Sequence, residues 1–102
     1  MANARAVEAA LLARCVAVAR GEVPQALDER EANVLWVGAS VVGSRYPLEA
    51  GRLRQASERY FATHPGERRR AGEMVQRGWV IGLPRLRDML SRELDLARRG
   101  QR

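Results

Sequence analysis

The sequence contains no lysine, and all eighteen of its basic residues are arginine. Functions that need an ammonium group are therefore excluded, among them Schiff-base catalysis, a phosphate-binding P-loop lysine and regulation by lysine acetylation. Two explanations fit this bias. A GC-rich genome favours arginine codons, whereas selection for guanidinium geometry favours the paired binding of carboxylates or phosphates. The abundance of Ala and Gly supports the first explanation, so we expect a bacterial source.

Other absences narrow the range of functions further. With one cysteine, Cys15, the chain has neither a disulfide framework nor a Cys-based metal cluster. The longest largely apolar run, 34–42, is too short for a membrane span, which needs about twenty residues. Glu8 and Arg14 interrupt the apolar N-terminal stretch where a secretory signal would be unbroken. We therefore expect a cytoplasmic protein without a metal, a cofactor or a membrane partner.

Segments with helical periodicity, separated by proline and glycine, account for most of the chain. Proline fits the first turn of a helix because it lacks an N–H and has a fixed φ. The chain 1–102 therefore predicts a single all-α domain with four to five helices in a compact arrangement, at about 3–20, 25–45, 48–63, 66–80 and 84–99. A strand over the valine-rich 34–42 is the alternative. Two glycines and an acidic lead-in favour a helix there.

The second predicted helix is apolar on nearly every side in its second half. Val34, Val37 and Val41 form one stripe, and Trp36 points away from it. A helix that is apolar all round is usually buried all round, and a chain this short offers little cover. We therefore expect Val34, Trp36, Val37 and Val41 to form a partner or dimer interface, in a homodimer through the first two helices. The first helix has a back of small residues that would let another helix approach closely: Ala6, Ala9, Ala13 and Ala17.

Most arginines have an acidic residue at helical spacing. Asp88 with Arg92, and Asp95 with Arg99, are four residues apart and predict intrahelical ion pairs. Two groups instead occupy first turns of predicted helices, where the helix dipole disfavours cations. They predict contacts with an anionic partner, which is either nucleic-acid phosphate or an acidic protein surface: Arg68, Arg69, Arg70, Arg85 and Arg87.

No arrangement of residues indicates catalysis. Cys15 lies on an apolar helix face, where a thiol behaves as a small hydrophobe. His64 precedes a proline at a helix junction, typical of a capping or surface histidine, and has no matched nucleophile. Glu93 interrupts the apolar stripe of the last helix, and we expect it to pair with an arginine from another helix or subunit. The chain is therefore not expected to be an enzyme.

These observations favour a small, non-enzymatic regulatory protein. It would bind another protein through an apolar helix face rimmed by arginine, for example sequestering a transcription regulator as an anti-activator. The alternative is a nucleic-acid-binding regulator whose arginine clusters contact phosphates. The net charge of +6 and the pI of about 11.1 fit this alternative. Zinc-finger spacing, an RNP-like aromatic motif and a basic region leading into a zipper are all missing from the sequence.

Overall fold

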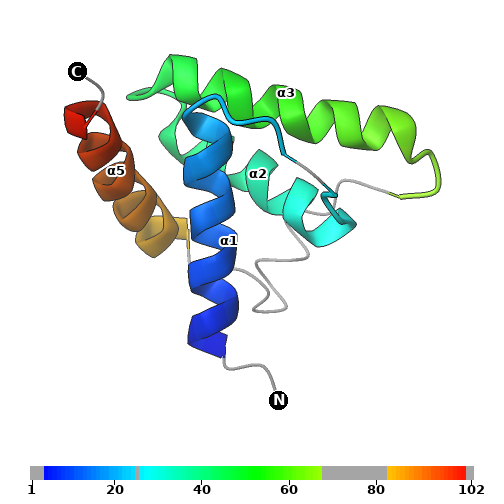
Figure 1. The fold of residues 1–102 in the computed structure, drawn as a ribbon, viewed down its shortest axis with the longest axis horizontal. Helices are drawn as coiled ribbons and strands as arrows, with labels where there is room; N and C mark the ends of the chain where they lie inside the picture. The colour runs from blue at the N-terminus through cyan, green and yellow to red at the C-terminus, as the bar shows by residue number, and fades with distance from the viewer. Residues whose placement is uncertain (1–3, 25, 68–82, 101–102) are drawn as a thin grey trace.

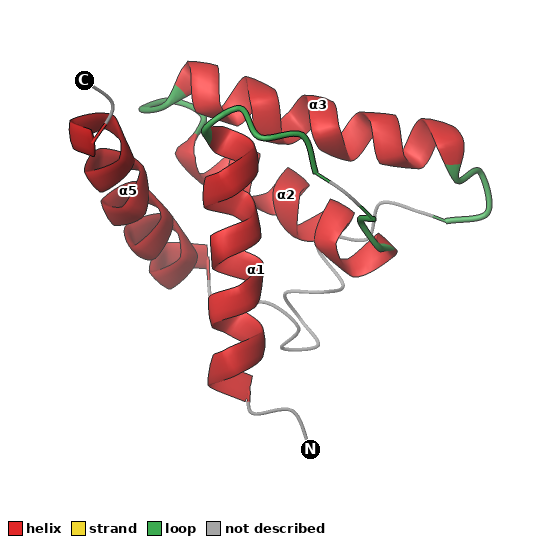
Figure 2. Ribbon diagram, viewed as in Figure 1, coloured by secondary structure: helices red, strands yellow, loops and turns green. Residues whose placement is uncertain are grey.

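The computed structural model describes residues 4–24, 26–67 and 83–100, which form four helices and no strand (Figures 1 and 2). The all-α prediction is confirmed for these residues, and the strand alternative at 34–42 is wrong. The predicted fourth helix lies almost entirely in 68–82, outside the described residues. The observed helices are α1 (Ala4–Ala19), α2 (Glu29–Val42), α3 (Pro47–Thr63) and α5 (Leu83–Gly100).

Helix α2 is the centre of the described structure, because α1, α3 and α5 all pack against it (Figure 1). Gly38 marks the crossing point. A Cβ atom added there would lie 3.3 Å from Leu90 Cδ2, and 3.6 Å from both Cys15 Sγ and Leu53 Cδ1. These three side chains come from α5, α1 and α3. The missing side chain of Gly38 therefore lets three helices converge on one turn of α2.

The valine-rich half of α2 is covered by its own chain. Val34 and Val37 are 2% and 3% exposed and belong to the core, together with Leu35 and Val42. The expectation that the chain is too short to cover this segment is therefore wrong for Val34 and Val37, because three helices surround it. Trp36 and Val41 are half-buried.

A capping box begins α2. The Asp28 carboxylate accepts a hydrogen bond from the Glu31 backbone N–H at 2.7 Å, and Glu31 Oε1 accepts one from the Asp28 N–H at 3.1 Å. The other oxygen, Glu31 Oε2, pairs with Arg14 Nε on α1 at 2.8 Å. The Glu31 carboxylate therefore both caps the N-terminus of α2 and links α2 to α1.

Glycine and arginine end α1. Gly21 has a left-handed φ of 98°, and its N–H donates to the Val18 carbonyl while the Glu22 N–H donates to Ala17. These bonds form a Schellman motif, which favours glycine at this position. Arg52 Nη1 on α3 donates to the Ala19 carbonyl at 2.9 Å. The end of α1 is therefore held by local geometry and by α3.

Helix α5 follows the predicted apolar pattern at its centre. Leu86, Leu90 and Leu94 face the core and are at most 3% exposed, whereas Leu96, at the edge of the predicted apolar arc, is 48% exposed. None of the described helices has both the length and the apolar character that crossing a membrane requires. The helices fit within 41 × 28 × 25 Å.

Gly38→Val is expected to lower the free energy of unfolding by about 1–3 kcal/mol, because branched methyl groups would be forced against Leu90 and Cys15. The matched change is Gly51→Ala on α3, where nothing lies within 4 Å of the added Cβ. It should raise stability by about 0.5–1 kcal/mol through helix propensity. Urea unfolding followed by circular dichroism measures both. If the two substitutions changed the free energy of unfolding equally, the close packing of three helices at Gly38 would be contradicted.

Candidate interaction surfaces

The two predicted arginines on the first turn of α5 lie in different grooves. Arg85 Nη2 is 3.8 Å from Glu8 Oε2 on α1, and Arg85 lines the groove between α1 and α5. Arg87 Nε is 3.4 Å from Asp88 and lines the groove between α2 and α5. The other predicted members, Arg68, Arg69 and Arg70, lie outside the described residues. The structure therefore does not bring Arg85 and Arg87 together as one anion-binding cluster.

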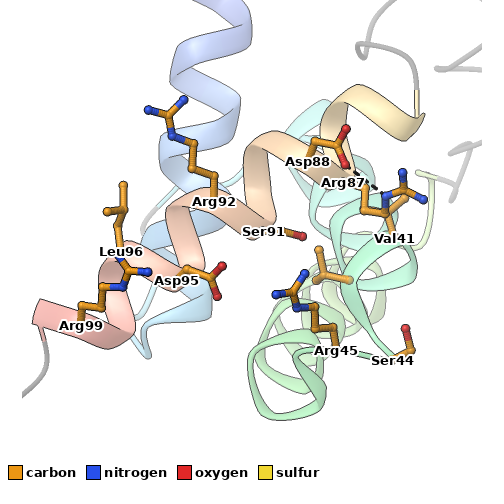
Figure 3. Close-up of a pocket in the computed structure, with 11 residues that line it drawn as sticks. Val41, Ser44, Arg45, Arg87, Asp88, Ser91, Arg92, Asp95, Leu96 and Arg99 are labelled. Atoms are coloured by element: carbon orange, nitrogen blue, oxygen red, sulfur yellow. Dashed lines mark hydrogen bonds and ion pairs between the residues drawn. The ribbon is translucent and has the colours of Figure 1, made fainter.

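The groove between the end of α2 and α5 contains four arginines, and we call it the arginine groove (Figure 3). Its volume is about 530 Å³. Apolar side chains from both helices share its lining with Ser44, Ser91, Asp88 and Asp95. Arg87 thus lies in the same groove as Val41, which the sequence assigned to a separate apolar interface. The arginines of the groove are Arg45, Arg87, Arg92 and Arg99, and its apolar residues are Val41, Val42 and Leu96.

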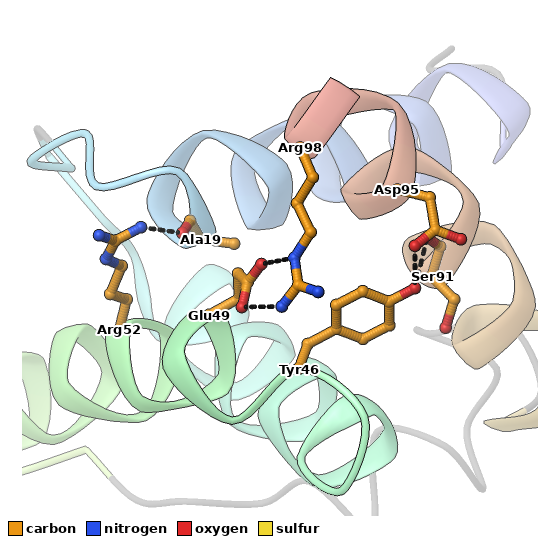
Figure 4. Close-up of polar contacts among 7 residues, drawn as sticks. All are labelled: Ala19, Tyr46, Glu49, Arg52, Ser91, Asp95 and Arg98. Atoms are coloured by element: carbon orange, nitrogen blue, oxygen red, sulfur yellow. Dashed lines mark hydrogen bonds and ion pairs between the residues drawn. The ribbon is translucent and has the colours of Figure 1, made fainter. Parts of the chain in front are cut away.

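A polar clamp made by Tyr46, Glu49, Asp95 and Arg98 holds α5 beside the α2–α3 turn (Figure 4). Arg98 donates two hydrogen bonds to the Glu49 carboxylate, at 2.6 and 2.9 Å. The Tyr46 hydroxyl donates to the Asp95 carboxylate, and the Arg98 guanidinium lies 4.7 Å from the Tyr46 ring centroid. This clamp fixes the wall of the arginine groove that α5 supplies.

The clamp changes the pKa values of two of its members. Hydrogen bonding from the Arg98 guanidinium lowers the pKa of the buried Glu49 carboxyl and outweighs the opposing effect of its burial. Burial raises the pKa of the Tyr46 hydroxyl, and the adjacent Asp95 carboxylate raises it further. Glu49 is therefore held as a carboxylate and Tyr46 as a neutral hydrogen-bond donor.

The predicted intrahelical pairs on α5 do not form. Asp95 accepts from Tyr46 rather than from Arg99, and Asp88 pairs with Arg87 rather than with Arg92. Arg92 and Arg99 are exposed and make no ion pair within the described part of the chain. Asp95 bonds to Tyr46 of the α2–α3 turn instead of to an arginine on its own helix, because a buried tyrosine hydroxyl needs a hydrogen-bond acceptor. Two guanidinium groups on the groove therefore remain available.

A second surface is the outward face of α1, which we call the α1 ridge: Ala6, Ala9, Ala10, Ala13 and Ala17. The first four are exposed and Ala17 is half-buried. Ala13 and Ala17 line the grooves on both sides of the helix, one shared with α5 and one with the start of α2. The small residues that would let another helix approach closely are therefore mostly exposed in the described structure.

Charged residues rim both grooves beside the α1 ridge. The groove on the α5 side is bordered by Arg20, Arg85, Glu8, Glu22 and Glu93, and the other groove by Arg14, Arg30, Asp28 and Glu31. Glu93 is half-buried and forms no hydrogen bond or ion pair with any residue that the structure describes. The pairing predicted between Glu93 and an arginine of another helix is therefore not formed within the described residues.

No family model, curated protein or solved structure matches this chain. Function must therefore be inferred from the surfaces themselves.

The residues considered for catalysis have structural contacts. Cys15 is fully buried, and burial raises the pKa of its thiol to about 12, so the thiol stays protonated. His64 Nδ1 lies 2.8 Å from the Tyr60 carbonyl, and its ring stacks on the Tyr60 ring, which confirms its expected capping position. Among the described residues, no group of three His, Cys, Asp or Glu side chains could hold a metal ion.

Glu49→Gln is expected to reduce the acid sensitivity of the fold. Pairing lowers the folded-state pKa of Glu49, so its stabilisation is complete above the unfolded pKa of about 4.3. It is lost as the pH falls through the lower folded-state value. Thermal unfolding of both proteins between pH 7 and pH 2.5 tests this. The variant should be less stable at pH 7, and the gap should narrow in acid; a constant gap would contradict the proposed role.

Proposed function

We propose that this chain is a non-enzymatic regulatory protein that acts by binding another protein through the α1 ridge. The observation that carries the proposal is the run of exposed alanines on α1 from Ala6 to Ala13, with no charged side chain on that face between them. Small side chains let the backbone of a partner helix approach closely, and the adjoining grooves can accept its larger side chains. Sequestering a transcription regulator as an anti-activator is a function of this physical kind.

The charged residues along the two grooves beside the α1 ridge would orient the bound partner. Arg14, Arg20, Arg30 and Arg85 border the two grooves together with acidic residues, so the charges can set the register of a partner that carries both signs. Glu93 supplies the opposite charge inside the groove on the α5 side, where a basic side chain of the partner could reach it. Apolar contact would provide most of the affinity, and the charges would provide specificity.

The proposed interface differs from the one expected from the sequence. Val34 and Val37 are in the core, and Val41 lines the arginine groove. Trp36 lies on α2 with the Arg54 guanidinium 5.8 Å from its ring centroid, which is a cation–π contact with α3. We therefore assign the apolar interaction face to α1 instead of α2, and its rims carry acidic residues as well as arginines.

Ala13→Glu is the direct test of the proposed function. An uncompensated carboxylate buried against a partner costs several kcal/mol, so affinity should fall by about a hundredfold or more. Ala62→Glu, at an exposed position on α3, is the matched control. Affinity capture from source lysate with nuclease present, repeated at high salt, should retain a protein on the wild type and on Ala62→Glu but not on Ala13→Glu. Capture by all three proteins would contradict the proposal.

Self-association through α1 would cover the same surface when no partner is present. Both charge signs border the grooves beside the ridge, so the surface is complementary to itself in charge. Sedimentation velocity over a concentration series should show a dimer for the wild type and for Ala62→Glu, and a monomer for Ala13→Glu. A wild-type protein that stays monomeric at high concentration would contradict self-association through α1.

Nucleic-acid binding is the alternative function, and salt distinguishes it. Binding to phosphates weakens steeply and log-linearly with salt, whereas an apolar interface changes little. Within the described residues, Arg85 and Arg87 line different grooves, so no single face gathers both. The protein-binding proposal is therefore the better supported of the two.

A further inference from the structure

The arginine groove has an excess of positive charge available to a ligand. Its two acidic residues are already engaged, Asp95 by the Tyr46 hydroxyl and Asp88 by Arg87. Arg92, Arg99 and Arg45 make no ion pair among the described residues, and the Arg45 guanidinium lies 5.7 Å from the Tyr46 ring centroid. The guanidinium groups of these three arginines can therefore donate hydrogen bonds to the carboxylates of a ligand.

Apolar surface lies between these charges. Leu96 is 48% exposed, and it lies between Arg92 and Arg99 in the sequence of α5. Val41 lines the same groove from the end of α2 (Figure 3). A ligand that fits the groove must therefore present apolar groups as well as anionic ones.

The spacing along α5 defines the ligand more closely. Arg92 and Arg99 are seven residues apart, which is about 10.5 Å along a helix, with Leu96 close to the midpoint. A partner helix lying alongside α5 repeats this spacing when acidic residues stand at i and i+7 and an apolar residue stands at i+3 or i+4. These positions share one face of that helix.

Nucleic acid fits the groove less well. A continuous row of phosphates would have to pass Asp88 and Asp95, whereas a helix can carry carboxylates only at the positions that meet arginines. The phosphate backbone also has no apolar group to place against Leu96 and Val41. An acidic amphipathic helix can place its carboxylates on the arginines and its apolar residue on Leu96, as in helix-in-groove recognition.

We propose that the arginine groove is a second docking site, which binds an acidic amphipathic helix of a partner protein. The inference rests on the proposed function insofar as the partner is a protein, but it uses a surface separate from the α1 ridge. Two such sites would allow one partner to be held at two points, which raises its effective affinity.

The test uses a fluorescein-labelled synthetic helical peptide with Glu at i and i+7 and Leu at i+3 and i+4. The same peptide with Gln in place of Glu is the ligand control. Fluorescence anisotropy with the full chain should show the acidic peptide binding at least about tenfold more tightly than the Gln peptide. Equal binding of the two peptides would overturn the proposal.

Protein variants locate the site. Arg92→Glu with Arg99→Glu should weaken binding of the acidic peptide by about tenfold or more, and Leu96→Ser should weaken it as well. Arg54→Glu with Arg59→Glu is the matched control, since both are exposed arginines of α3 outside the arginine groove and outside the rims of the α1 ridge, and the charge change is the same. Equal loss in the two double variants would show a general charge effect and overturn the site.

Further protein variants and a DNA ligand distinguish the arginine groove from other binding sites and from nucleic-acid binding. Arg92→Gln with Arg99→Gln should also weaken binding, and circular dichroism of every variant reports whether it folds. If Ala13→Glu abolishes peptide binding while the groove variants retain it, the peptide binds the α1 ridge and this proposal fails, although the proposed function stands. If labelled duplex DNA binds through Arg92 and Arg99 and the acidic peptide does not, the groove is a nucleic-acid site.

Discussion

The convergence of three helices on α2 at Gly38 is the contact on which the rest of the structure depends. Cys15, Leu53 and Leu90 reach this point from α1, α3 and α5. Protein interiors are packed as densely as organic crystals, so a position without a side chain sets how near the surrounding helices can come. The grooves on either side of α5 follow from that approach, because they are the spaces between α5 and its two neighbours.

Carboxylates used within the fold determine which arginines remain on the surface. Glu49 accepts from Arg98, and Glu31 both caps α2 and pairs with Arg14. With Asp95 accepting from Tyr46, the exposed residues Arg92 and Arg99 have no ion pair among the described residues. Such arginines are free to bind partners without loss of stability, since exposed ion pairs contribute little to folding.

Helix positions were largely predictable from local sequence. Pro47 and Pro84 lie in the first turns of α3 and α5, close to the predicted starts, and the periodicity placed Leu53, Leu90 and Leu94 in the core. The start of α2 was predicted four residues early, because Asp28 and Glu31 were treated only as an acidic lead-in and their capping box was not recognised. Helical periodicity shows which side chains share one face of a helix. The predicted core residues were therefore correct where a single helix face packs against the rest of the chain.

Tertiary relations were not predictable in the same way. An apolar helix such as α2 has the same pattern whether its own chain or a second molecule covers it, so Val34 and Val37 were assigned to an interface. The groups in the arginine groove that the sequence missed, Arg45, Arg92 and Leu96, meet only because α5 crosses beside the end of α2. The spacing of Arg92 from Asp88 predicted an ion pair within one helix, and such spacing carries no information about the helix opposite.

The buried position of Cys15 protects its thiol from oxidants in the folded molecule. Its sulfur lies in the helix crossing, with no exposed surface and a protonated thiol. Peroxide and disulfide exchange both require thiolate that solvent can reach. A disulfide between two copies of the chain is thus a signature of molecules that have unfolded.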